Sequence, residues 1–203
     1  MIASWTESRK PVLAAITPLK KHWAGQIALV VMGSVVVALL AQISIPLPWT
    51  PIPVTGQTLG VLLVGGALGG WLGGASLLLY LVEGAIGLPV FAPHASSAIF
   101  GATGGYLVGF ILMAATVGWL AERGWDRSLM RSIGAMAIGE LVLYAIAVPW
   151  LGFYVGFGRA IPLGFVPFIS GDALKLLIAG GLFPAAWLLV GNRPSLDAPK
   201  HKS

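Results

Sequence analysis

The sequence predicts an all-α membrane protein with six transmembrane helices and with both termini in the cytosol. Three observations lead to this prediction: a shortage of charge, a series of apolar segments, and basic residues grouped at alternate ends of those segments. Hydrophobic residues make up 57% of the 203-residue chain and charged residues only 9%, whereas an ordinary soluble domain is about 25% charged. So few charges would leave the surface of a soluble fold uncovered, so lipid must surround the chain.

Six apolar segments are separated by proline, glycine or charged residues. The expected spans are residues 26–43, 57–68, 71–86, 104–120, 133–149 and 171–190. The first ends before Pro46 and the third before Gly87 and Pro89, because proline removes a backbone donor and glycine weakens a helix. The glycine-rich stretch 65–74 allows either a tight turn between the second and third spans or helices that continue through it. At about 20 residues per span, six spans leave no room for a second soluble domain.

The positions of lysine and arginine predict the orientation, since cytosolic loops carry an excess of these residues. With six spans and a cytosolic N-terminus, ten of the twelve basic residues fall on the cytosolic side. They are Arg9, Lys10, Lys20, Lys21, Arg123, Arg127, Arg131, Arg193, Lys200 and Lys202. Only Arg159 falls in an outer loop, and Lys175 lies at or within the sixth span. An odd number of spans would place the C-terminal tail outside.

The chain therefore divides into a basic cytosolic tail at 1–25, a six-helix transmembrane substrate-binding domain at 26–191 and a cytosolic C-terminal tail at 192–203. The first tail differs from a cleavable signal peptide because no apolar core separates its basic residues. The basic residues flank apolar segments and do not alternate with aromatic residues, which argues against nucleic acid binding. The absence of cysteine excludes disulfides and thiol chemistry.

Four ionisable residues lie at or within the expected spans: Glu83, Glu140, Asp172 and Lys175. A charge at the centre of a membrane helix costs about 2.5–3.5 kcal/mol, so such residues are functional candidates. Asp172 and Lys175 share one helix face, and they suit a ligand with N–H donors at one place and a carboxylate at another. Alternatively, Ser170 or Asp172 caps the helix, and Lys175 either pairs with Asp172 or extends outward. Glu83 and Glu140 are interpreted as structural or helix-contact residues.

Two outer loops combine rigid, aromatic and small polar residues. The first carries Trp49, Thr55 and Gln57 among four prolines, and the second carries Phe91, His94 and Ser96. Apolar walls with few polar groups are typical of a small-molecule site. The aromatic residues are equally consistent with an interfacial belt.

Small residues recur on the first span, at Ala24, Ala28, Ser34 and Ala38. Small residues at helical spacing let membrane helices approach closely. The stripe predicts either internal packing or docking against another membrane protein.

Four motifs occur in order along the chain. They are Pro48-x-Thr50-Pro51-x-Pro53-x-Thr55-x-Gln57-Thr58, Gly87-Leu88-Pro89-Val90-Phe91, Thr103-Gly104-Gly105-Tyr106-Leu107 and Pro167-Phe168-x-x-Gly171-Asp172-x-x-Lys175. Together, over about residues 44–179, they resemble the BioY family, the biotin-specific S components of energy-coupling factor transporters. The family often has a glycine-rich stretch with a polar ureido contact after Phe91. This sequence departs from that pattern, and His94, Ser96 or Ser97 are candidates for the role.

The resemblance implies an S-component fold that captures biotin at the outer face of the bacterial cytoplasmic (inner) membrane. It implies that Asp172 engages the ureido ring and that Lys175 binds near the carboxylate end. The expected substrate-binding residues are Asp172, Lys175, Gln57, Thr55, Trp49, Phe91, His94, Ser96, Tyr106 and Tyr144. It also implies two kinds of partner, a membrane T protein and the ABC-type ATPases that power import. The resemblance leaves open which helix face meets the T protein, and the first-span stripe is a candidate.

The expected function is biotin binding and uptake without catalysis, cofactor or metal. The chain has no P-loop of the Gly-x4-Gly-Lys-[Ser/Thr] kind, so ATP hydrolysis must reside in partner subunits. Only His94 among the three histidines lies outside the tails, and no metal-ligand spacing occurs. An S component for another small vitamin and a solitary small-molecule carrier remain open alternatives.

Overall fold

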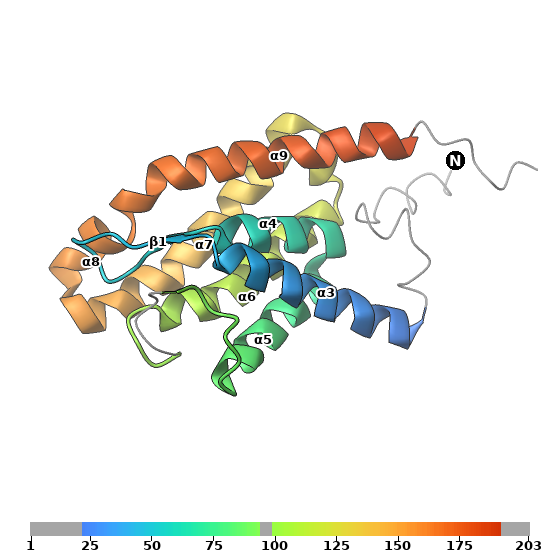
Figure 1. The fold of residues 1–203 in the computed structure, drawn as a ribbon. Coiled ribbons are helices and arrows are strands. Elements are labelled where there is room, and N and C mark those ends of the chain that lie inside the picture. Colours follow the sequence, from blue (N-terminus) through green and yellow to red (C-terminus); the bar gives the residue numbers. More distant parts are fainter. Residues whose placement is uncertain (1–21, 94–98, 192–203) are drawn as a thin grey trace, which may run out of the picture.

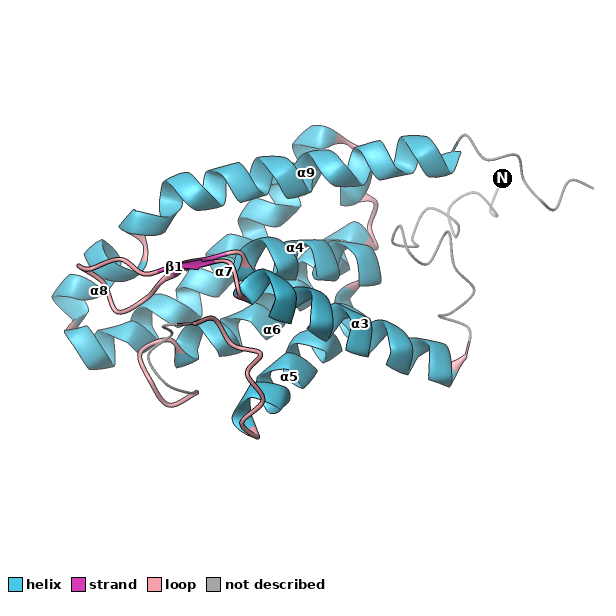
Figure 2. Ribbon diagram, in the orientation of Figure 1, coloured by secondary structure: helices cyan, strands magenta, loops and turns pink. Residues whose placement is uncertain are grey.

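The computed structural model describes residues 22–93 and 99–191, and these are mostly helical (Figures 1 and 2). The long helices are α3 (Trp23–Ala41), α4 (Gln57–Leu68), α5 (Gly70–Ala85), α6 (Gly104–Ala121), α7 (Leu129–Val155) and α9 (Ile169–Gly191). Shorter elements are α8 (Phe157–Gly164), η2 (Trp125–Arg127), η3 (Val166–Phe168), β1 (Ser44–Ile45) and β2 (Val54–Thr55). Each of the six expected spans therefore corresponds to one long helix.

Four helical stretches are long and apolar enough to cross a membrane: Trp23–Ala41, Gly104–Ala121, Leu129–Val155 and Phe157–Leu189. Helices α4 and α5 have 12 and 16 residues, fewer than the roughly 20 residues of a full span. Many large apolar side chains face outward, including Leu39, Trp71 and Leu141 at 66%, 82% and 66% exposed. Exposed apolar surface on this scale marks a contact with lipid or a partner, as expected of a membrane protein.

The break between α4 and α5 lies at Gly69, which selects the tight turn over continuous helices. Gly69 has a positive φ of 87° and both ends α4 and begins α5, a conformation that glycine adopts readily. The two helices then pack closely, because a Cβ on Gly73 would lie 2.9 Å from the Cα of Gly65. Helix α6 packs against this hairpin, since a Cβ on Gly118 would lie 2.3 Å from the carbonyl carbon of Gly69.

Helix α7 corrects the expected end of the fifth span. The helix was expected to stop at Pro149, but it continues to Val155 and ends before Gly156, which has a φ of 87°. A proline within a membrane helix is tolerated when neighbouring groups compensate for the lost hydrogen bond. Helix α8 and the η3 turn follow where the sequence predicted only a loop. Gly156, Pro162 and Gly164 are residues typical of loops, so the sequence pattern gave no sign of these short helices.

Helix α9 lies along one side of the bundle and packs on α4 and α7 (Figure 1). Its C-terminal part is held by η2, where Trp187 Nε1 donates to Asp126 Oδ2 at 2.6 Å. The guanidinium of Arg127 also lies 4.4 Å from the centre of the Trp187 ring. Asp126 is 2% exposed, and desolvation raises the pKa of its carboxyl above the usual 3.8, against smaller lowering effects of Trp187 and Arg127.

The four-proline loop between α3 and α4 is fixed at three points. Strands β1 and β2 pair antiparallel at its base, with Ser44 opposite Thr55. At its tip, Thr50 Oγ1 donates to the carbonyl oxygen of Leu163 at 2.7 Å, which ties the loop to α8. Ser44 Oγ donates to the carbonyl oxygen of Pro93 at 2.8 Å. The loop is therefore a fixed cover over the adjoining helix ends, as its prolines predicted.

Candidate functional site

A cavity lies beneath the four-proline loop, between α4, α6, α7 and α9. It contains about 700 Å³ of space between atoms, part of it in the opening. Its apolar walls come from Ile52, Phe91, Leu107, Phe110, Leu143 and Phe168. Its polar groups come from Thr55, Gln57, Thr58, Thr103, Tyr106, Tyr144, Asp172 and Lys175. Few polar groups among apolar walls are typical of a site for a small organic molecule.

Asp172 and Lys175 form the charged part of this cavity. Lys175 Nζ lies 3.0 Å from Asp172 Oδ1 and donates to Thr58 Oγ1 at 2.7 Å. Tyr144 donates to the other carboxylate oxygen, Oδ2. Helix α9 is thus joined to α4 through Thr58 and to α7 through Tyr144. The sequence left pairing and ligand binding as alternatives, and the structure shows a pair that also lines the cavity.

Tyr106 forms the wall beside this pair. Its hydroxyl donates to the carbonyl oxygen of Gly164 at 2.5 Å, and its ring meets that of Tyr144 edge-on with centroids 6.4 Å apart. Tyr144 also packs edge-on against Phe165 at 4.8 Å. The aromatic wall is therefore held by Gly164 at the end of α8 and by Phe165 just after it. The neighbouring residue of α8, Leu163, accepts the bond from Thr50.

Gln57 begins α4 on another wall and is held by a chain of hydrogen bonds. Thr55 Oγ1 donates to Gln57 Oε1 at 3.0 Å, and Gln57 Nε2 donates to the hydroxyl of Tyr80 at 2.7 Å. Tyr80 in turn donates to the carbonyl oxygen of Val90 at 3.1 Å. The ring of Phe91 meets Tyr80 edge-on at 5.4 Å. The two outer loops are thereby joined through α5.

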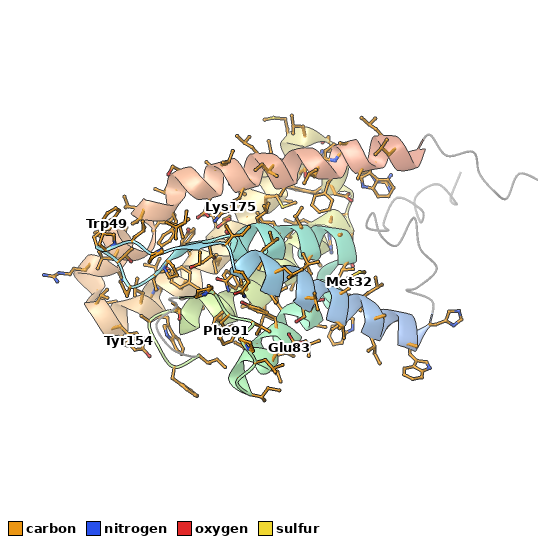
Figure 3. The ribbon with its side chains drawn as sticks, in the orientation of Figure 1. Met32, Trp49, Glu83, Phe91, Tyr154 and Lys175 are labelled. Atoms are coloured by element: carbon orange, nitrogen blue, oxygen red, sulfur yellow. The ribbon has the colours of Figure 1, made fainter. Side chains whose placement is uncertain are left out.

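Eight further residues besides the charged pair were expected to bind the substrate, and the structure places them differently. Thr55, Gln57, Phe91, Tyr106 and Tyr144 line the cavity together with Asp172 and Lys175. Trp49 does not: it is 62% exposed and lies on the outer loop apart from Lys175 (Figure 3). In this structure Ile52 and Pro53 of the same loop line the cavity, and Trp49 does not. His94 and Ser96 lie outside the described residues.

Two residues that organise the cavity escaped the sequence interpretation. Thr58 stands in the first motif, but nothing local marks it as the partner of Lys175, which is 117 positions away. Tyr80 is 1% exposed and lies within a predicted span, where a tyrosine gives no signal of the residues it contacts. Phe110 and Leu143 also line the cavity and are indistinguishable in sequence from other buried apolar residues.

The small residues of the first span, on α3, are partly exposed on the surface and partly buried in the protein. Ala24 and Ala28 are exposed and Ala38 is partly exposed. Ser34 is fully buried and donates to the carboxylate of Glu83 on α5. Ser34 therefore faces another helix of this chain, so its expected place on a docking surface is wrong. The same bond gives Glu83 the structural role expected of it.

Glu140 lies on α7 one turn before Tyr144 and is 5% exposed. Neither of its carboxyl oxygens has a hydrogen-bond partner among the described residues. It does not line the cavity. No His, Cys, Asp and Glu cluster within the described ranges is suited to hold a metal ion.

Comparisons with known proteins show which proteins this chain is similar to. The model of the BioY family matches residues 10–192. The chain is 41% identical over 155 residues to "Biotin transporter BioY" of Thermotoga maritima, covering 75% of this chain and 85% of that protein. It is 37% identical over 158 residues to "Probable biotin transporter BioY" of Pyrococcus horikoshii, covering 77% and 92%. The fold matches a crystal structure of the S-component for biotin from an ECF-type ABC transporter, with a TM-score of 0.73, 21% identity, and coverage of 85% of this chain and 94% of that one.

Proposed function

The chain belongs to the BioY family, and on this basis we propose that it is the biotin-binding subunit of a vitamin importer. The names of its relatives support the ligand, and the S-component fold supports the role as a membrane transport subunit. The single structural observation behind the proposal is the largely buried Asp172–Lys175 pair, which supplies both charges of a cavity whose other walls combine apolar side chains with hydroxyl and amide groups.

Biotin carries chemical groups that complement this cavity. Its ureido ring presents two N–H donors and one carbonyl acceptor, its thiophane ring is apolar, and its valerate chain ends in a carboxylate. A buried ureido group needs hydrogen-bond partners, because an unpaired buried polar group costs free energy. Asp172 supplies the acceptor, the aromatic walls contact the thiophane ring and chain, and Lys175 supplies a cation.

In the proposed roles, Asp172 accepts the ureido N–H groups and Lys175 binds the carboxylate. Lys175 pairs with Asp172 in the structure, whereas the ureido ring and the carboxylate lie at opposite ends of biotin. Ligand binding must therefore replace the Lys175 ammonium at Asp172 and move it toward the valerate end. The flexible four-carbon stem of lysine permits such a move. Thr55, Gln57, Phe91, Tyr106 and Tyr144 are proposed to complete the site.

The proposed topology is six spans with both termini in the cytosol of a bacterial cell, within the cytoplasmic membrane. The positions of basic residues support it, with tails at 1–25 and 192–203 and a transmembrane domain at 26–191. Helices α4 and α5, with 12 and 16 residues, are short for full spans, and their outer ends continue into the two outer loops.

The proposed partners are a membrane T protein and ABC-type ATPases. The sequence lacks a P-loop, so energy from ATP would have to come from other subunits. Ala24, Ala28 and Ala38 are proposed to contact the T protein, since small residues on an exposed helix face allow close packing in lipid.

Mass spectrometry of the ligand retained through purification tests the function. Cells are grown with biotin, the protein is purified in detergent, and the bound small molecules are released and identified. The expected result is biotin at one molecule per chain. Another vitamin in its place would assign the chain to a different substrate. An empty protein that also fails to bind added biotin would overturn the proposal.

A further inference from the structure

Tyr80 lies outside the cavity but touches two of the residues that form it. It is 1% exposed on α5. Its hydroxyl accepts from Gln57 and its ring packs edge-on against Phe91. Gly84, one turn further along α5, leaves space for the Phe91 ring, because a Cβ on Gly84 would lie 2.0 Å from that ring. Tyr80 is therefore placed to control how Gln57 faces the cavity.

The hydrogen bonds of the Tyr80 hydroxyl determine which of the two terminal atoms of the Gln57 amide, nitrogen or oxygen, faces Tyr80. The carbonyl oxygen of Val90 can only accept, so the hydroxyl of Tyr80 must donate its proton there. The oxygen of Tyr80 is then left to accept, and only the nitrogen of the Gln57 amide can donate to it, at 2.7 Å. The Thr55 hydroxyl cannot impose this direction alone, since it both donates and accepts.

With this direction fixed, one hydrogen-bonding group of Gln57 remains for a ligand. Thr55 donates to Oε1 and Tyr80 accepts one of the two N–H groups of Nε2. No second partner for that nitrogen lies within residues 22–93 and 99–191, and Gln57 lines the cavity at 6% exposed. The cavity thus presents an N–H donor from α4 and a carboxylate acceptor from Asp172 on α9.

We propose that Tyr80 is a positioning residue, which fixes the Gln57 amide so that its free N–H donates to the carbonyl oxygen of the ligand's ureido ring. The inference rests on the proposed function and deepens it by naming the group that reads the carbonyl. A ureido ring needs one donor and an acceptor from its site. Gln57 and Asp172 supply both, and Tyr80 prevents the amide from turning its oxygen toward the ligand's oxygen.

Three ligands separate this role from a general structural one. Biotin and desthiobiotin both carry the ureido carbonyl, whereas 2-iminobiotin at neutral pH carries a protonated guanidino group without an acceptor at that position. In Tyr80→Phe, which keeps the ring against Phe91, we expect the affinity for biotin and desthiobiotin to fall about tenfold, the scale of one hydrogen bond. The affinity for 2-iminobiotin should stay within about twofold. The dissociation constant for biotin therefore moves closer to that for 2-iminobiotin.

Tyr154→Phe is the matched control, because the Tyr154 hydroxyl also donates to a backbone carbonyl, that of Phe100, but outside the cavity. It should change none of the three affinities. Gln57→Leu removes the proposed donor, so Tyr80→Phe added to Gln57→Leu should leave the biotin to 2-iminobiotin ratio unchanged. If Tyr80→Phe does not fold, Gln57→Glu provides the test: it replaces the donor by an acceptor and should shift the preference toward 2-iminobiotin.

Equal losses of affinity for all three ligands in Tyr80→Phe, or no loss for any of them, would overturn the inference. The proposed function would still stand if the wild-type protein binds biotin. An unchanged preference in Gln57→Glu would overturn it in the same way. Failure of the wild-type protein to bind biotin would overturn both.

Discussion

The ammonium of Lys175 lies 3.0 Å from a carboxylate oxygen of Asp172, and this ion pair faces a cavity and not lipid. Within the described ranges it is the one ion pair the structure holds. Burying two charges costs several kcal/mol per ion unless further hydrogen bonds compensate. Thr58 and Tyr144 supply those bonds from two other helices, so the pair both joins three helices and prepares a polar site.

Lys175→Ala should weaken binding of biotin more than binding of biotin amide. If Lys175 binds the valerate carboxylate, its removal costs a charged hydrogen bond, about tenfold or more in affinity, only for the acid. Isothermal titration calorimetry with both ligands measures the difference. Equal losses for acid and amide would assign Lys175 solely to neutralising Asp172. Lys175→Arg, which keeps the charge, should lose less than Lys175→Ala for the acid.

The helix pattern was predictable because apolar segments and their breakers are local features. The second span was predicted at 57–68, and α4 has those bounds. The i, i+3 spacing of Asp172 and Lys175 likewise predicted a shared face, and the two side chains meet. What the sequence could not give was the arrangement between distant segments, such as Thr58 beside Lys175 or Tyr80 beneath Gln57.

The position of Trp49 also depended on contacts between distant segments that the sequence does not reveal. An aromatic residue in a proline-rich outer loop suits a pocket wall or an exposed surface equally well. The loop is held to α8 by the bond from Thr50 to the carbonyl oxygen of Leu163, which joins residues 113 positions apart. No local pattern predicts such a contact. In the folded chain Ile52 and Pro53 line the cavity, and Trp49 does not.

Gly118→Ala should destabilise the fold by about 1–3 kcal/mol, the usual cost of overpacking. A Cβ at Gly118 would lie 2.3 Å and 2.4 Å from backbone atoms of Gly69 and Gly70, which cannot move without opening the α4–α5 turn. Thermal unfolding in detergent measures the effect. Gly181→Ala is the control, because nothing lies within 4 Å of a Cβ there. Similar melting temperatures for the two variants would refute the close contact of α6 with the turn.

Asp126→Asn should stabilise the protein increasingly as the pH rises. Burial raises the pKa of the Asp126 carboxyl above 3.8, so the folded state holds this proton more tightly than the unfolded chain. Stability from this group is then complete below the unfolded pKa and is lost as the pH rises through the folded pKa. Asparagine does not titrate, so the gain in melting temperature should vanish toward acidic pH. A gain that is independent of pH, or a loss at neutral pH, would contradict this expectation.

Single cysteines should report the orientation of the chain, because the natural sequence has none. Ser128 precedes α7 and Arg159 lies in α8 just beyond its other end. Helix α7 has 27 residues, so at about 1.5 Å per residue its ends are about 40 Å apart. An impermeant maleimide should label Arg159→Cys in intact cells and Ser128→Cys only after permeabilisation. The reverse pattern would invert the topology, and labelling of both in intact cells would reject it.

Titration calorimetry of biotin on the wild-type protein and on Asp172→Asn tests the central claim most directly. Glu83→Gln is the matched control, since that carboxylate is bound by Ser34 and does not line the cavity. The wild type and Glu83→Gln should bind one biotin per chain with similar affinity. Asp172→Asn should bind at least about 100-fold more weakly, because the ureido ring loses its charged acceptor and Lys175 its counter-ion. Unchanged affinity in Asp172→Asn would show that biotin does not bind in this cavity.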